Sequence, residues 1–269
     1  MFSFVDHIVA ITDTAIRGRF AVPEQFGGAP DWLLFEAIGQ LAAWAAMRDS
    51  DFAKRPVGAT VGSLDFSGSR RPRGVLELTA TIDRTDRRAI LYGGEARSQG
   101  EPVAVMRRCI GPLLPMEAFD DPGSVRARFE ALTGPKPVPL WAATDAVPEA
   151  WISPPETRSD GGVTAEFRVD ERAAFFSDHF PRQPVVPATL LIEAMCRVGA
   201  IAVAVHEQRS EPVLFDQVRQ VKVRQFTKPG QLLRLESEGV RPGLGRPEVQ
   251  VTAHSGDDLI AGVRVSCGV

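Results

Sequence analysis

The sequence lacks the features of several protein classes. Its three cysteines, Cys109, Cys196 and Cys267, are far apart and odd in number, and no Cys-x-x-Cys pair occurs. Neither a disulfide framework nor a zinc site is therefore predicted, and we expect no metal. The formal net charge is only -3 over 269 residues, so the chain has no overall field that would recruit nucleic acid.

Long apolar runs and a leader peptide are lacking as well. The longest apolar stretches, residues 32–47 and 198–205, are shorter than the roughly 18 to 20 residues of a membrane span. The first ten residues, MFSFVDHIVA, contain an aspartate and neither a basic region nor a cleavage site, so we expect that they are not a signal peptide. These absences predict a cytoplasmic protein that does not contact a membrane.

The chain does contain an internal repeat. The segment PDWLLFEAIGQLAAWAAM at 30–47 is similar to PATLLIEAMCRVGAIAVAV at 187–205, and each has Glu-Ala six residues after its proline, at Glu36 and Glu193. Proline is tolerated at a helix start because its missing N–H has no intrahelical partner there. Both segments are predicted to be helices that are apolar nearly all round and hence buried. A glutamate in such a helix is costly unless it is paired or protonated.

Strand-like runs follow each helix and are broken by turns. They lie at 57–66, 75–83, 89–98 and 102–112 in the first half, and at 213–225, 232–238, 248–254 and 258–266 in the second. One antiparallel sheet wrapped around one apolar helix in each half would explain why neither helix has a polar face, and it gives an α+β fold class. Residues 120–133 are predicted to form a short amphipathic helix before a stiff proline-rich stretch. We predict an N-terminal domain at 1–116, a linker at 117–139 and a C-terminal domain at 140–269.

The sharpest local feature is the segment DHFPRQPVVP at 178–187. Its three prolines favour an ordered, non-helical loop that presents His179 and leads into the helix with Glu193. Measured from Phe20 and Phe167, the two helical glutamates lie sixteen and twenty-six residues downstream. The first repeat is thus about ten residues shorter, and the part it lacks is the His-bearing loop. We predict one working site rather than two.

HFPxxPxxP followed by LLIEAM, with this His-to-Glu spacing, resembles the bacterial 3-hydroxyacyl-ACP dehydratases of the FabZ type. The related FabA type has Asp in place of the Glu. The likeness covers most of residues 160–269, and the first half resembles the same hot-dog superfamily more weakly, through EAIGQ at 36–40. The resemblance implies a fused double hot-dog, in which two antiparallel sheets each wrap around a central apolar helix.

The resemblance also implies where the site lies. In the family, the histidine comes from one protomer and the acid from the central helix of the other. In a fused pair the partner of His179 would then be Glu36, with Glu193 as a secondary acid. The enolate oxygen would be held by the backbone amides of Asp31 and Trp32 at a helix N-terminus. The substrate pocket would include Phe180, Pro187 and Ala188.

These residue types suit the dehydration of a 3-hydroxyacyl thioester, which removes an α-proton and expels a β-hydroxyl. An imidazole near neutral pKa can take the proton, and a glutamic acid whose pKa is raised in an apolar pocket can protonate the leaving group. The resemblance implies no cofactor, only the phosphopantetheine arm of ACP or CoA that carries the substrate. It leaves open a homo- or hetero-oligomer. The candidate cations for docking an acidic carrier protein are Arg70, Arg71, Arg73, Arg219, Lys222 and Arg224.

Two residues depart from the family pattern. Ala188 stands where glycine is usual, which narrows the space beside the amide expected to hold the thioester oxygen. Arg197 stands where glutamine is usual and places a cation one turn from Glu193, which would keep that carboxylate ionised.

Two alternatives to the dehydratase remain open. One is a hot-dog acyl thioesterase, which would direct water with the helix acid and would not need the HFPxxPxxP loop. The other is a non-catalytic acyl-binding subunit that pairs with a dehydratase, as the two departures and the missing first-half loop would suggest. Fatty acid, polyketide and polyene-type biosynthesis could each use the predicted activity.

Overall fold

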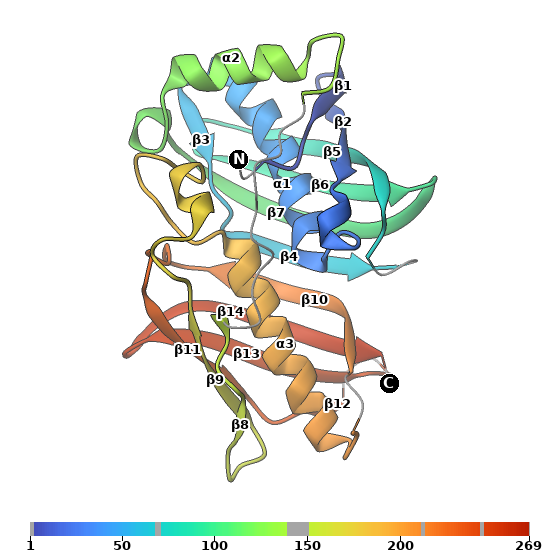
Figure 1. Cartoon of the computed structure of the whole chain (residues 1–269), viewed down its shortest axis with the longest axis vertical. Coiled ribbons are helices and arrows are strands. Elements are labelled where there is room, and N and C mark those ends of the chain that lie inside the picture. The colour runs from blue at the N-terminus through green and yellow to red at the C-terminus, as the bar shows by residue number, and fades with distance from the viewer. Residues whose placement is uncertain (1–2, 68–70, 139–150, 211–212, 243–244, 269) are drawn as a thin grey trace.

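The computed structural model describes residues 3–67, 71–138, 151–210, 213–242 and 245–268 (Figure 1). Its described strands form one continuous antiparallel sheet in the order β1-β2-β5-β6-β7-β4-β10-β14-β13-β11-β9-β8, with β3 and β12 beside β7 and β13. The path β2-β5-β6-β7-β4 of the first half is repeated as β9-β11-β13-β14-β10 in the second. The two halves are therefore related by a pseudo-twofold axis at the seam between β4 and β10.

The elements of the N-terminal half are β1 (His7–Ile11), β2 (Ala15–Val22), η1 (Glu24–Phe26), α1 (Asp31–Asp49), β3 (Lys54–Pro56), β4 (Thr60–Phe66), β5 (Gly74–Thr85), β6 (Ala89–Ser98) and β7 (Glu101–Pro115). The connecting segment contains η2 (Met116–Ala118) and α2 (Pro122–Leu132). The C-terminal half contains β8 (Glu156–Thr157), β9 (Val163–Arg168), η4 (Ala174–Ser177), α3 (Ala188–His206), β10 (Leu214–Val223), β11 (Leu232–Ser237), β12 (Arg241–Pro242), β13 (Pro247–Ser255) and β14 (Asp258–Gly268).

The two central helices form where the repeat predicts them. Pro30 and Pro187 precede α1 and α3 in extended conformations, and each helix then buries nearly its whole circumference because its own half of the sheet curls around it (Figure 1). By length and composition α3 could cross a membrane, but 67% of its most apolar window is buried inside the protein. The helix is therefore explained as the core of its half.

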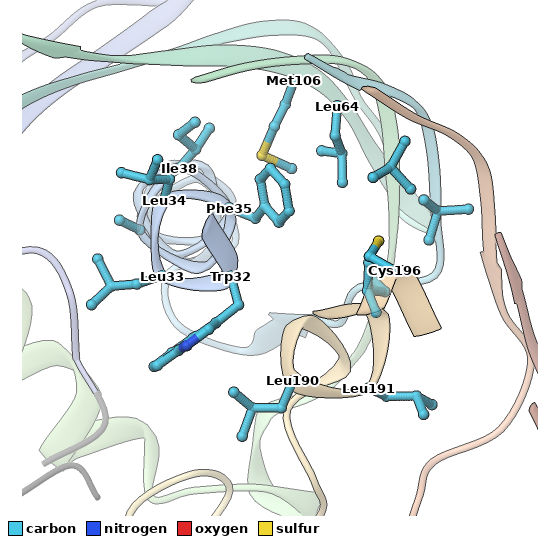
Figure 2. Packing of buried hydrophobic residues seen from close by; sticks show 14 of the residues in the cluster. Trp32, Leu33, Leu34, Phe35, Ile38, Leu64, Met106, Leu190, Leu191 and Cys196 are labelled. Carbon is cyan, nitrogen blue, oxygen red and sulfur yellow. The ribbon is translucent and has the colours of Figure 1, made fainter. Parts of the chain in front are cut away.

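The core is continuous across the two halves (Figure 2). Leu33 and Ile38 of α1 are fully buried, as is Leu64 of β4 at the seam. Leu64 pairs in register with Val218 of β10, and both side chains are inaccessible to solvent. The sheet therefore joins edge to edge and the helices pack within one core, which confirms the double hot-dog fold.

The connecting helix α2 lies at one end of the molecule, over the C-terminal part of α1 (Figure 1). Asp121 caps it by accepting a hydrogen bond from the amide of Ser124 at 2.8 Å, which satisfies one of the free N–H groups of the first turn. Phe129 packs on Trp44 and Phe52, with ring centroids 6.0 and 5.4 Å apart. The predicted helix at 120–133 is thus present, slightly shorter. The predicted domain boundary at 140 lies outside the described residues and stays a prediction.

Candidate active site

The loop that carries His179 is held against the segment that connects the two halves. Arg182 donates its backbone N–H to the carbonyl of Phe119 at 3.0 Å and its Nη1 to the carbonyl of Glu117 at 3.0 Å. At the other end of the loop, the amide of Val186 donates to the carbonyl of Thr227 at 2.8 Å. Because both ends are fixed by backbone contacts, the loop places the imidazole in a defined position.

The imidazole of His179 has a defined tautomer and a defined plane. Its Nδ1 lies 3.1 Å from the carbonyl oxygen of Val185, which can only accept, so Nδ1 carries the proton and Nε2 carries the lone pair. The ring stacks on Phe180 with centroids 4.3 Å apart, and Phe180 adopts a left-handed backbone conformation with φ of 62°. Burial lowers the pKa of His179 to about 3, and the charge of Arg55 acts in the same direction. The imidazole is therefore unprotonated at neutral pH, but the same burial makes it a weaker base than an imidazole whose pKa is near neutral.

Glu36 lies in the second turn of α1, and both of its carboxyl oxygens accept hydrogen bonds. Gln40, one turn further along, donates Nε2 to Oε1 at 2.9 Å. Thr189, in the first turn of α3, donates its hydroxyl to Oε2 at 2.8 Å. Burial raises the pKa of Glu36, against the two hydrogen bonds and the charge of Arg55, which lower it. A raised pKa is what a general acid needs near neutral pH.

His179 and Glu36 line the same cavity, which has a volume of about 180 Å³. One wall is a face of α1, on which Glu36, Gly39 and Gln40 are exposed to the cavity. The other walls come from β3, β4, β6, β7 and β10, from α2, from the His-bearing loop and from the start of α3. The structure thus brings the second-half histidine and the first-half glutamate to one space between the halves.

Two arginines add positive charge to this cavity. The guanidinium carbon of Arg55, on β3, lies 4.8 Å from the centroid of the Phe180 ring, so Arg55, Phe180 and His179 form a stack. In the part of the chain that the structure describes, Arg55 makes no ion pair, and burial lowers its pKa. Arg128 of α2 pairs with Asp178 at 3.4 Å, directly before His179 in the chain.

The amides of Asp31 and Trp32, expected to hold the enolate oxygen, stay a prediction. Asp31 and Trp32 are not among the described residues that line the cavity, whereas Ala188 and Thr189 are. Trp32 is 2% exposed and packs edge-on against Phe4 in the core. The cavity meets the start of α3, the helix that follows the His-bearing loop, at Ala188 and Thr189.

Two of the three predicted pocket residues line the cavity. Phe180 and Ala188 line the cavity as expected. Pro187 is absent from its described lining, because this residue is buried as the cap that precedes α3. Its part in the pocket stays a prediction, since its neighbours Val186 and Ala188 both line the cavity.

Glu193 is separated from this cavity. Its side chain is buried, with 7% of the residue exposed, and its Oε1 lies 3.2 Å from Nε of Arg197. Arg197 therefore pairs with Glu193 as the four-residue spacing leads one to expect. Glu193 is not among the described residues of the cavity that contains His179.

None of the described candidate docking cations lines the cavity, and Arg70 lies outside the described residues. Arg73 donates to the carbonyl of Gly27 at 3.0 Å, and the neighbouring bond from Ala29 to Pro72 repeats the one from Val186 to Thr227. Arg71 and Arg73 thus flank the first-half loop that lacks a histidine. On β10, Arg219 pairs with Glu248. At the end of this strand and directly after it, the exposed Lys222 and Arg224 alternate with Val221, Val223 and Gln225, which do line the cavity.

The polar cavity residues that were not predicted from the sequence include Thr189, Arg55, Arg128 and Tyr92. Thr189 could have been noticed as a hydroxyl inside an otherwise apolar helix start. No local motif marks the other three, because strand and helix packing alone brings them to the cavity. The described residues contain no cluster of three or more His, Cys, Asp or Glu side chains that could hold a metal ion.

Comparison with known sequences points to one family. The FabA-like domain matches residues 150–260. The 3-hydroxyacyl-[acyl-carrier-protein] dehydratase FabZ of Moorella thermoacetica is 41% identical over 68 residues, covering 25% of this chain and 48% of that protein. The corresponding FabZ of Chloroflexus aggregans is 33% identical over 96 residues, covering 34% of this chain and 67% of that protein. The chain spans about half the length of the first of these relatives.

Solved structures match both halves together. The dehydratase domain of the polyketide PpsC from Mycobacterium tuberculosis superposes with a TM-score of 0.56 at 12% identity, covering 100% of this chain and 98% of that one. A putative oleoyl thioesterase from Lactobacillus plantarum superposes with a TM-score of 0.59 at 11% identity, covering 94% and 95%. At such identities these likenesses show the double hot-dog fold alone. The sequence relatives establish that the chain belongs to the FabA/FabZ-like family of hot-dog dehydratases.

Proposed function

We propose that the protein dehydrates a 3-hydroxyacyl thioester to a 2-enoyl thioester at a single site between its two halves. The observation that carries this proposal is that His179 and Glu36 line one cavity although they lie in different halves of the chain. His179 is unprotonated at neutral pH and Glu36 has a raised pKa, so we assign them as the base and the acid of the reaction.

The base in the proposed reaction is Nε2 of His179, which takes the α-proton of the substrate. As that proton leaves, charge develops on the thioester oxygen. A backbone amide at a helix N-terminus is suited to stabilise it, and the amide of Ala188 begins α3 at the cavity wall. We assign this role to the amide of Ala188 in place of the amides of Asp31 and Trp32.

The acid is Glu36, which protonates the β-hydroxyl so that it leaves as water. The C–O bond breaks while the electrons of the former α-C–H bond form the double bond. His179 retains the α-proton and Glu36 becomes a carboxylate, and exchange with solvent restores both. Glu193 has no direct part in this reaction because its carboxyl group faces Arg197 in another part of the core.

The carrier of the substrate is proposed to be an acyl carrier protein with its phosphopantetheine arm, since the FabZ relatives are named for acyl-carrier-protein substrates. The proposed location is the cytoplasm. Fatty acid and polyketide-type synthesis are the pathway classes to which this activity would belong. The thioesterase alternative is supported by fold likeness alone, whereas the His-bearing loop that a thioesterase would not need lines the cavity.

The proposal is tested by incubating the protein with 3-hydroxyacyl thioesters of several chain lengths on ACP and on CoA. Mass spectrometry should detect loss of one water from the acyl group without release of thiol, and the His179→Ala protein should lack this activity. Free thiol without the enoyl product would instead establish a thioesterase. Tight acyl-ACP binding without turnover would establish a binding subunit.

A further inference from the structure

Thr189 connects the two halves of the chain at the acid of the proposed site. It lies in the first turn of α3, 153 residues away from Glu36, and its hydroxyl donates to Glu36 Oε2 at 2.8 Å. Both residues line the cavity that also contains His179. None of the sequence comparisons assigns a role to this hydroxyl.

Gln40 determines which oxygen of Glu36 can carry a proton. Its side-chain Oε1 accepts the backbone N–H of Phe4 at 2.9 Å, so its NH₂ group must face Glu36 Oε1, 2.9 Å away. If the side-chain amide of Gln40 were reversed, its NH₂ group would face the backbone N–H of Phe4, and two donors would oppose each other. Because an NH₂ group can only donate, Oε1 has to accept, and a proton on Glu36 is confined to Oε2.

We infer that Oε2 is the oxygen from which Glu36 delivers its proton, and that Thr189 is a positioning residue that stabilises the carboxylate left behind. This inference deepens the proposed function and rests on it. When Oε2 releases its proton to the leaving hydroxyl, the negative charge that forms is met at once by the hydroxyl of Thr189. Hydrogen bonds to a charged acceptor are about twice as strong as neutral ones, so Thr189 favours the state after transfer over the state before it.

The hydroxyl is already directed at Glu36 before any substrate binds. Thr189 is in the first turn of its helix, where no preceding turn offers a carbonyl to its hydroxyl. The carbonyl of Val185, four residues earlier, is the acceptor for His179. One short stretch of chain thus fixes the tautomer of the base and supplies a donor to the acid.

The test compares Thr189→Val, which removes the hydroxyl at nearly constant shape, with Thr189→Ser, which keeps it. The protonation of Glu36 is followed by the infrared carbonyl stretch of its carboxyl group, identified by its loss in Glu36→Gln. The hydrogen bond from Thr189 lowers the pKa of Glu36. In Thr189→Val, the Glu36 carboxyl should therefore titrate about one pH unit higher than in the unmodified protein. In Thr189→Ser, the Glu36 carboxyl should titrate at the same pH as in the unmodified protein.

A matched control is Thr60→Val, because Thr60 also lines the cavity but is not bonded to Glu36 among the described contacts. It should not move the titration of Glu36. In turnover assays, Thr189→Val should lower kcat by about tenfold and move the alkaline limb of the pH profile upward, because the acid stays protonated to higher pH.

The outcomes separate this inference from the proposed function. Equal Glu36 titration in Thr189→Val and in the unmodified protein, or a Thr189→Ser protein that behaves like Thr189→Val, would overturn the role of Thr189 even if dehydration is observed. A shifted titration in a protein that dehydrates no thioester would leave the coupling of Thr189 to Glu36 intact and overturn the function. Because the infrared readout needs no substrate, it remains decisive if Thr189→Val folds but turns over slowly. If Thr189→Val fails to fold, Thr189→Ala is titrated in its place with the same expected shift.

Discussion

The Nδ1 atom of His179 lies 3.1 Å from the carbonyl oxygen of Val185, six residues further along the same loop. This contact fixes Nε2 as the basic nitrogen. Replacing His179 with Ala should therefore abolish dehydration, with a loss of about 10²- to 10⁴-fold, while thermal stability stays near that of the unmodified protein. Product formation and thermal unfolding are the measurements, and full activity in the variant would contradict the proposed base.

Glu36 and Glu193 occupy equivalent positions in the repeat but different surroundings, and their substitution by Gln should separate them. Glu36→Gln should abolish turnover, because an amide cannot deliver the proton and Glu36 faces the His179 cavity. Glu193→Gln should reduce turnover only modestly, through its lost pairing with Arg197. Steady-state kinetics of the two variants test this. An inactive Glu193 variant beside an active Glu36 variant would place the site within one half.

The buried imidazole should make the fold sensitive to acid. The pKa of His179 is lowered from 6.5 to about 3 in the folded protein, chiefly by burial, so between these values the unfolded chain binds a proton that the folded chain does not. Stability contributed by neutral His179 is complete above the unfolded pKa and decreases as the pH falls toward the folded one. Denaturant unfolding from pH 7 to pH 4 should show a shallower loss of stability for His179→Gln. Parallel curves would refute the buried neutral state.

Gly39 is predicted to lower the stability of α1 and to leave space in the cavity, because it has no side chain. It lies inside α1 and faces the cavity, and a Cβ added there would meet the Tyr92 hydroxyl at 3.6 Å, an ordinary contact. Gly39→Ala should stabilise the protein by about 0.5 to 1 kcal/mol through helix propensity. The same methyl group narrows the cavity, so kcat/KM should fall more for long acyl chains than for short ones. An equal effect on all chain lengths would show that acyl chains do not pass Gly39.

The sequence was sufficient to predict the architecture because the repeat is carried by long, strongly patterned segments. Residues 30–47 and 187–205 could only be buried helices, and the strand runs after them showed alternation and turn residues. The strand β3 (Lys54–Pro56) was not predicted, because three residues carry no periodic signal and its pairing with β7 is set by tertiary structure.

The site residues that belong to a sequence motif were predicted, whereas those brought to the site only by packing were missed. His179 and Glu36 follow from the HFPxxPxxP loop, the helical repeat and the family resemblance. The amides were assigned to Asp31 and Trp32 because they begin the helix of Glu36, yet the cavity reaches the N-terminus of the other helix at Ala188. The bond from Thr189 to Glu36 spans 153 residues, and no local pattern encodes how two helices of different halves approach each other.

The shared seam between β4 and β10 also has a consequence for how such a protein can diverge. In a homodimer built from two identical chains, every substitution occurs twice and both clefts change together. Here one continuous backbone supplies both halves, so a deletion in one loop leaves the opposite loop untouched. The chain can lose one cleft and adapt the remaining one, with a connecting helix over it, to a task that a symmetric pair would have to perform in duplicate.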